Sequence, residues 1–102
     1  MGLFSFTQEI AIDLGTANTI IIQNGKIVLD EPSIVALDGR TDKLIAIGTK
    51  AQQMQGKTHE NIRTIRPLRD GVIADFYAAE IMIRGMIKMI SNKNSFFSPS
   101  LK

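Results

Sequence analysis

A carboxylate and a run of small residues lie between two apolar segments near the start of the chain, in the stretch IAIDLGTANTIII. If the small residues form a hairpin turn, glycine lets the backbone approach a ligand closely, and successive N–H groups can form a concave site for phosphate. The carboxylate would end the first strand beside that site, where it could hold Mg²⁺ directly or through water. The carboxylate is Asp13, and the turn residues are Gly15, Thr16, Ala17 and Asn18.

The same residues also fit a simpler interpretation, a tight hairpin with polar residues at its tip. Neither a Walker loop nor a dinucleotide-binding loop is present, because Gly-Lys-Ser/Thr and Gly-x-Gly-x-x-Gly are both missing from this stretch. Hydroxyl and amide groups of Thr16, Asn18 and Thr19 would add donors if the turn binds phosphate. The motif alone leaves both interpretations open.

Alternating apolar residues predict strands on both sides of this turn, at residues 9–14 and 19–23. Asn24-Gly25 is typical of a two-residue hairpin turn, because both positions tolerate a positive φ. A third strand is predicted at residues 26–30. The chain therefore opens as an antiparallel three-strand meander.

A small strand-rich insertion is predicted after Pro32, followed by a long helix that begins after Asp75, a good N-cap. Strands are expected at 33–38, 43–48 and 61–67, with a short helix at 49–56 that has Thr49 as its N-cap. A turn with a connecting segment at 68–75 then leads to the long helix. Apolar residues at helical spacing predict that the long helix is largely buried on a sheet. They are Phe76, Ala79, Ile83, Met86, Ile87 and Ile90, widened by Ile81, Met82 and Met89.

Composition excludes several classes of protein. The 102 residues suffice for one small domain with a modest core, and 44% of them are hydrophobic, which is ordinary for a globular protein. The absence of cysteine excludes disulfide scaffolds and thiolate metal sites. No apolar run approaches the roughly 20 residues that span a bilayer, and the N-terminus lacks the features of a signal peptide. We therefore expect a cytoplasmic protein.

Basic residues gather in one segment but do not predict nucleic acid as a partner, because acidic residues interrupt them and few aromatic side chains are available for stacking. They are Lys57, His59, Arg63, Arg66 and Arg69, interrupted by Glu60 and Asp70. A solvated surface is the favoured interpretation, with a filament contact as the alternative. A metal site at the single histidine is not expected, since no cysteine or second histidine is present.

Several segments carry a resemblance to a known family. IAIDLGTANT resembles the first phosphate-binding hairpin of the actin, Hsp70 and sugar-kinase superfamily. NGKIVLDEPSIVAL, IGTKAQQMQGKTHENI and IRPLRDGVIADF narrow the resemblance to the MreB family of bacterial actin-like proteins, over residues 9–97. The resemblance implies the N-terminal part of an α/β actin-like ATPase (ribonuclease H-like) fold, with an apolar tail at residues 1–8. Subdomain IA would then comprise residues 9–31 and 67–102, and subdomain IB residues 32–66.

The resemblance also implies a function. Proteins of this family bind ATP with Mg²⁺ and assemble into protofilaments on the inner face of the cytoplasmic membrane, where they organise the cell-wall elongation machinery and rod shape. The resemblance implies that Thr16, Ala17 and Asn18 at the tip of the hairpin contact the nucleotide. It also implies that Gly15 lets the backbone approach the ligand closely and that Asp13 holds Mg²⁺ through water. The alternative is a fragment of a small phosphotransferase or chaperone-type ATPase that shares the hairpin.

The family's second phosphate loop, adenosine-binding segment and water-activating acid have no counterpart in these 102 residues. Such a nucleotide site forms between two domains, and this chain would supply one wall of it. We therefore assign no catalytic residue, and we expect the chain alone to bind ATP weakly or not at all and not to hydrolyse it.

Two adjacent aromatic residues, Phe96 and Phe97, lie in the polar stretch SFFSPS. Aromatic residues in a loop commonly pack back onto the core, which is one interpretation here. The family resemblance implies the other, a hydrophobic loop that inserts into the membrane. Leu3, Phe4 and Phe6 could add a second membrane contact.

Overall fold

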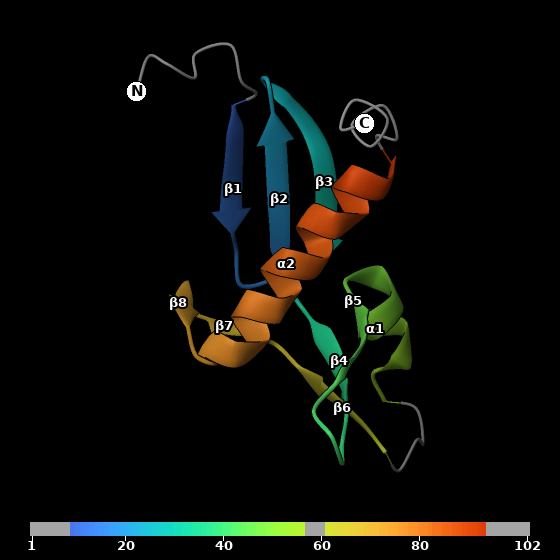
Figure 1. Cartoon of the computed structure of the whole chain (residues 1–102). Helices are drawn as coiled ribbons and strands as arrows, with labels where there is room; N and C mark the ends of the chain where they lie inside the picture. Colours follow the sequence, from blue (N-terminus) through green and yellow to red (C-terminus); the bar gives the residue numbers. More distant parts are fainter. Residues whose placement is uncertain (1–8, 57–60, 94–102) are drawn as a thin grey trace.

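Eight short strands and two helices make up the part of the chain that the computed structural model describes, residues 9–56 and 61–93 (Figure 1). The elements are β1 (Ile10–Leu14), β2 (Asn18–Gln23), β3 (Lys26–Pro32), β4 (Val35–Asp38), β5 (Leu44–Ile47), α1 (Thr49–Met54), β6 (Ile62–Ile65), β7 (Leu68–Arg69), β8 (Val72–Ile73) and α2 (Phe76–Lys93). The fold is mixed α/β, as the sequence predicts.

The first three strands form the predicted antiparallel meander, in the order β1-β2-β3. Asn24 and Gly25 connect β2 to β3 with φ values of 52° and 81°. Both values lie in the left-handed region that this turn type requires and that asparagine and glycine tolerate. The local sequence thus sets the pairing of β2 with β3.

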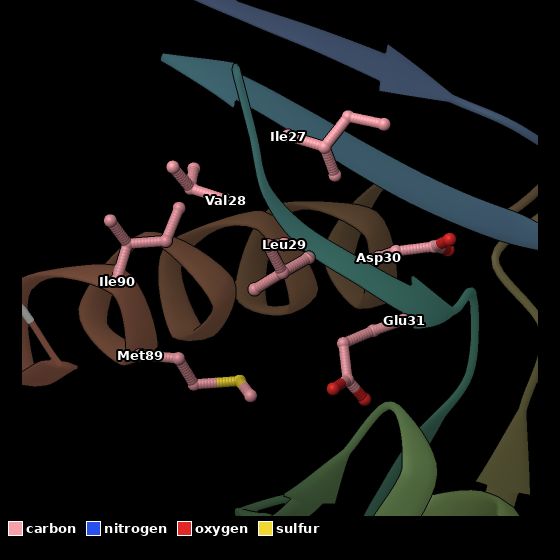
Figure 2. A pocket seen from close by; sticks show the side chains of 7 residues that line it. All are labelled: Ile27, Val28, Leu29, Asp30, Glu31, Met89 and Ile90. Atoms are coloured by element: carbon pink, nitrogen blue, oxygen red, sulfur yellow. The ribbon is translucent and has the colours of Figure 1, made fainter.

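Helix α2 covers one face of this sheet (Figure 1). Met82, Met86 and Ile90 of the helix share a buried core with Ile21 of β2 and Leu29 of β3. Figure 2 shows Leu29, Met89 and Ile90 between β3 and the C-terminal half of α2. The predicted packing of the helix on the sheet is confirmed.

The predicted N-cap of α2 is also confirmed. Asp75 Oδ1 accepts a hydrogen bond of 3.0 Å from the N–H of Ala78. This satisfies one of the amides that have no partner within the first turn of a helix. The predicted apolar face, however, is too wide: Phe76 is 76% exposed and Ile87 is 44% exposed. Both side chains lie on a flank of the helix, because only a narrower stripe along it faces the sheet.

The predicted N-cap of α1 is wrong. The N-cap position is Gly48, at φ 64°, and no side chain of α1 caps the helix. Instead, Oε1 of Glu31, at the end of β3, accepts a hydrogen bond of 2.7 Å from the N–H of Thr49. A Cβ on residue 48 would overlap this carboxylate, so glycine fits here for steric as well as conformational reasons.

Strand β4 joins two hydrophobic cores. It lies at the centre of the second sheet, in the order β5-β4-β6. Val35 and Leu37 on one face belong to the α2 core. Ile34, which precedes the strand, and Ala36 pack with Ala46 of β5 and Ala51 of α1. The strand-rich insertion is therefore packed on the meander and the long helix through β4.

A polar loop joins β4 to β5, between the two strands that the sequence predicts here. Oδ1 of Asp38 accepts hydrogen bonds from the N–H groups of Arg40 and Thr41, at 2.8 Å and 3.2 Å. These backbone donors stabilise the charged carboxylate and hold the pKa of Asp38 below its usual range. At the end of the loop, Asp42 forms an ion pair with Arg63 of β6, and its carbonyl oxygen accepts a 3.0 Å hydrogen bond from the Tyr77 hydroxyl.

We predict that Met82→Ala lowers the free energy of unfolding by about 2–5 kcal/mol, because it removes a fully buried side chain and leaves a cavity in the α2 core. Ile87→Ala on the same helix is the control and should cost less than about 1.5 kcal/mol, because the side chain of Ile87 is largely solvated. Urea denaturation followed by circular dichroism measures both. Equal losses in the two variants would contradict the described packing of α2.

Candidate functional site

The turn between β1 and β2 is a tight bend, not a helix, as the phosphate-hairpin interpretation requires. The N–H of Gly15 donates a hydrogen bond of 3.0 Å to the carbonyl oxygen of Asn18. A Cβ on residue 15 would lie 2.5 Å from that oxygen, closer than real Cβ contacts allow. Glycine is therefore required at position 15 by the close contact with the Asn18 carbonyl within the turn, independently of any ligand.

Buried Ser33, immediately after β3, holds the carbonyl groups of this turn. Its hydroxyl donates a 2.7 Å hydrogen bond to the carbonyl oxygen of Gly15, and its N–H donates a 2.9 Å hydrogen bond to the carbonyl oxygen of Ala17. The single hydroxyl proton of Ser33 is used in the first bond, so Thr19, whose Oγ1 lies 2.8 Å from Ser33 Oγ, is the donor in that pair. The carbonyl groups of Gly15 and Ala17 thus point toward Ser33.

The direction of the Gly15 carbonyl fixes the direction of the next amide, the N–H of Thr16. A trans peptide places its C=O and N–H on opposite sides, and the described residues contain no cis peptide. Since the Gly15 carbonyl faces Ser33, the N–H of Thr16 points away from it. Within the described part of the chain, the N–H groups of Thr16 and Ala17 form no hydrogen bond, and both residues are exposed. These two adjacent donors suit an anion.

The hydroxyl of Thr16 is held from a distant part of the chain. Its Oγ1 accepts a 2.7 Å hydrogen bond from the N–H of Gly71, in the turn between β7 and β8. Asp70 and Gly71 have φ values of 52° and 78°, so residues 68–73 form a small hairpin where the sequence analysis expected only a turn and a connecting segment. The Asp-Gly pair between Arg69 and Val72 is a recognised hairpin signal and could have revealed it.

Asp13 lies on the face of the sheet away from α2. Its neighbour Leu14 pairs with buried Thr19, and Asp13 itself pairs with Ile20. Because successive residues of a strand point to opposite faces, Asp13 and Asn18 share the face that α2 does not cover. The side-chain amide of Asn18 donates a 2.9 Å hydrogen bond to Asp30 Oδ1, which ties the tip of the hairpin to β3.

This donor set fits magnesium held together with phosphate better than a separate metal site. The described residues contain no group of three or more His, Cys, Asp or Glu side chains that could hold a metal. Mg²⁺ commonly uses one or two carboxylates, several waters and phosphate oxygens. The exposed carboxylate of Asp13 and the two free amides of the adjoining turn meet that requirement.

The structure thus places the residues predicted for the nucleotide site close together in the chain and the fold. Gly15, Thr16 and Ala17 form the turn, Asn18 begins β2, and Asp13 is the last but one residue of β1. One expected donor is wrong, because Thr19 is fully buried and bonded to Ser33. Sequence reasoning missed Ser33 and Gly71, which hold the turn.

A basic groove of about 620 Å³ borders the hairpin. Thr16 lines it together with three arginines and one carboxylate, all of them exposed: Arg63, Arg66, Arg69 and Asp70. Arg63 pairs with Asp42, whereas Arg66 and Arg69 form no ion pair with a described residue. These arginines are solvated, as the sequence predicts, and their positive charge favours an anion beside the hairpin.

The predicted membrane contacts lie outside the described residues. They are Leu3, Phe4, Phe6, Phe96 and Phe97. Among the helices that the structure describes, none combines the length and the hydropathy needed to cross a bilayer.

Comparison with known proteins matches residues 7–101 to the family model of the MreB/Mbl protein. The cell shape-determining protein Mbl of Bacillus subtilis (strain 168) is 50% identical over 97 residues, which cover 94% of this chain and 29% of Mbl. The cell shape-determining protein MreB of Escherichia coli (strain K12) is 48% identical over 100 residues, covering 93% of this chain and 28% of MreB. The chain thus spans less than a third of the length of these relatives.

Solved structures agree with this comparison. MreB5 of Spiroplasma citri bound to ADP superimposes with a TM-score of 0.72 and 42% identity, over 82% of this chain and 26% of MreB5. The same protein bound to AMPPNP gives a TM-score of 0.69 and 44% identity, over 83% of this chain and 25% of MreB5. Together, the family model, the relatives and the shared fold show that this chain belongs to the MreB/Mbl family of actin-like proteins.

Proposed function

We propose that this chain supplies the phosphate-binding hairpin of a filament-forming, ATP-binding actin-like protein that determines cell shape. The observation that carries the proposal is the orientation of the β1–β2 turn, whose carbonyls face Ser33 and whose Thr16 amide faces outward. Support also comes from MreB5, a structural neighbour that has been solved bound to ADP and bound to AMPPNP. Family membership favours this function over a phosphotransferase or a chaperone-type ATPase.

Each residue of the turn has a distinct role in this proposal. The N–H groups of Thr16 and Ala17 would donate to phosphate oxygens, and the Thr16 hydroxyl, which accepts from Gly71, keeps its own hydrogen for a phosphate. Asp13 would orient a water on Mg²⁺, and the ion would neutralise phosphate charge. Asn18 would hold the shape of the turn through Asp30.

The nucleotide proposal predicts a matched pair of results. The 102-residue chain should show no micromolar Mg·ATP affinity by isothermal titration calorimetry, because it supplies one wall of the site. A chimera in which it replaces the matching segment of B. subtilis Mbl should bind Mg·ATP and polymerise. In that chimera Gly15→Ala should weaken binding at least about tenfold, or about 1.4 kcal/mol, because the new Cβ pushes the turn open at Asn18.

Gly39→Ala is the control in the same chimera, since a Cβ there meets the Asn61 backbone at an ordinary 3.5 Å. Circular dichroism confirms that both variants fold. If Gly15→Ala bound Mg·ATP as tightly as Gly39→Ala, the role of the turn would be refuted. Micromolar affinity of the 102-residue chain would refute the expectation that one wall is insufficient.

We further propose that the protein acts in the cytoplasm at the inner face of the cell membrane, with other copies of itself and the cell-wall elongation machinery as partners. Support for the membrane contact comes only from the apolar residues near the two ends, Leu3, Phe4, Phe6, Phe96 and Phe97. Each inserted Phe side chain would contribute about 1.5–3 kcal/mol. Repetition along a filament would multiply such marginal contacts through avidity.

We expect filaments of the chimera to co-sediment less with liposomes after Phe96→Ser combined with Phe97→Ser, because two inserted aromatic side chains are lost. Phe76→Ser is the control, since Phe76 is 76% exposed but lies at the start of α2, outside the two proposed contact segments. Co-sedimentation with liposomes of anionic lipid measures both. Unchanged binding of the double variant would remove the assignment.

A further inference from the structure

A groove of about 690 Å³ separates α2 from the segment that carries β5 and α1. A second hollow of about 590 Å³ adjoins it and shares Leu44, Gly85 and Lys88 as lining residues. The helix and the strand are in close contact at Gly85, where a Cβ would lie 2.7 Å from Cδ1 of Ile47. The described residues that line the two hollows include none of the residues assigned to the nucleotide site. We call this surface the α2–β5 groove.

The floor of the α2–β5 groove is apolar and open to solvent. Leu44 and Ile45 of β5 are each 42% exposed, and Ile87 of α2 is 44% exposed. Isolated exposed apolar residues are normal, but a contiguous patch indicates an interaction site. These three large side chains line one continuous concave surface together with Ile47, Ile81 and Met89.

The rim of the groove is positively charged. Lys50 of α1 and Arg84 and Lys88 of α2 line it. Among the described residues, Lys50 and Lys88 form no ion pair, while Arg84 pairs with Glu80 of its own helix. Among the described residues that line the groove, Glu31 is the one carboxylate, and it already accepts the N–H of Thr49. Uncompensated cations therefore border an apolar floor.

Two long-range hydrogen bonds hold the walls of the groove together. Glu31 of β3 bonds to Thr49 of α1 at one end, and Figure 2 shows its side chain pointing away from the sheet toward the green part of the chain. Tyr77 at the start of α2 bonds to the carbonyl of Asp42 in the loop before β5. A surface fixed in this way requires little reorganisation when a ligand binds.

We propose that the α2–β5 groove binds an amphipathic helix of another protein, with apolar residues at i, i+3, i+4 and i+7 and with acidic residues beside them. The apolar side chains would fill the floor, and the acidic residues would meet Lys50, Arg84 and Lys88. A second copy of this chain is less suitable, since the two basic rims would repel each other. The binding of a lipid surface to the same residues is an outcome that the test distinguishes.

The test uses a library of 16-residue helical peptides displayed on phage and selected against the full chain. Phage that bind a folded variant combining Ile45→Ser with Lys88→Glu are first removed, because their peptides do not need an intact groove. The enriched peptides should be acidic and amphipathic. A synthetic copy should bind the wild-type chain saturably in fluorescence anisotropy, and at least about tenfold more weakly to Lys88→Glu alone or to Ile45→Ser alone.

Lys26→Glu combined with Ile27→Ser is the matched control, because Ile27 is 63% exposed on β3, outside the α2–β5 groove. This variant should bind the peptide as the wild type does. The proposal is overturned if no enriched peptide binds saturably, if the enriched peptides lack acidic residues, or if both groove variants bind unchanged. It is also overturned if Ile45→Ser instead abolishes a dimer in light scattering or the binding of phosphatidylglycerol vesicles.

Discussion

The buried side chain and backbone of Ser33 form the interaction on which the candidate site depends. Two of its donors hold the carbonyl groups of Gly15 and Ala17, and its hydroxyl accepts from Thr19 in the sheet. A net contribution of about 1 kcal/mol for each such bond is modest, but leaving a buried partner unsatisfied costs more. This network turns the carbonyls of Gly15 and Ala17 inward, so that the N–H of Thr16 points to the opposite side of the turn, where it can meet an anion.

The same residue connects the site to the rest of the fold. Ser33 follows β3 and is followed at once by Ile34 and β4, which is buried in two cores. A displacement of β4 would therefore move Ser33 and with it the hairpin. Thr16 provides a second connection, because its bond to Gly71 joins the turn to the β7–β8 hairpin that precedes α2. The turn is thus held between the meander and the segment leading to the long helix.

The insertion is tied to the meander and helix at points far apart in the sequence. Glu31 caps α1 across the junction, and Tyr77 of α2 bonds to the loop that ends at Asp42. These bonds fix the width of the α2–β5 groove, while Ser33 fixes the shape of the hairpin. The candidate site and the α2–β5 groove consequently rest on separate sets of contacts that meet in β3 and β4.

Short-range signals in the sequence determined the meander, the Asn24-Gly25 turn, the Asp75 cap and the bend at Gly15, because each depends on the φ preference or hydrogen-bonding capacity of neighbouring residues. Tertiary structure alone decided which residues hold the turn and what caps α1. Ser33 is hydrogen-bonded to Gly15 and Glu31 to Thr49, each pair being 18 positions apart in the sequence. Gly71 is hydrogen-bonded to Thr16, 55 positions away. Nothing in the local pattern specifies such pairings, since they arise only when packing of β4 and α2 brings the segments together. The same reason explains why Phe76 and Ile87 match the helical period and yet remain exposed: periodicity defines a face, but the width of the covering sheet decides how much of that face is buried.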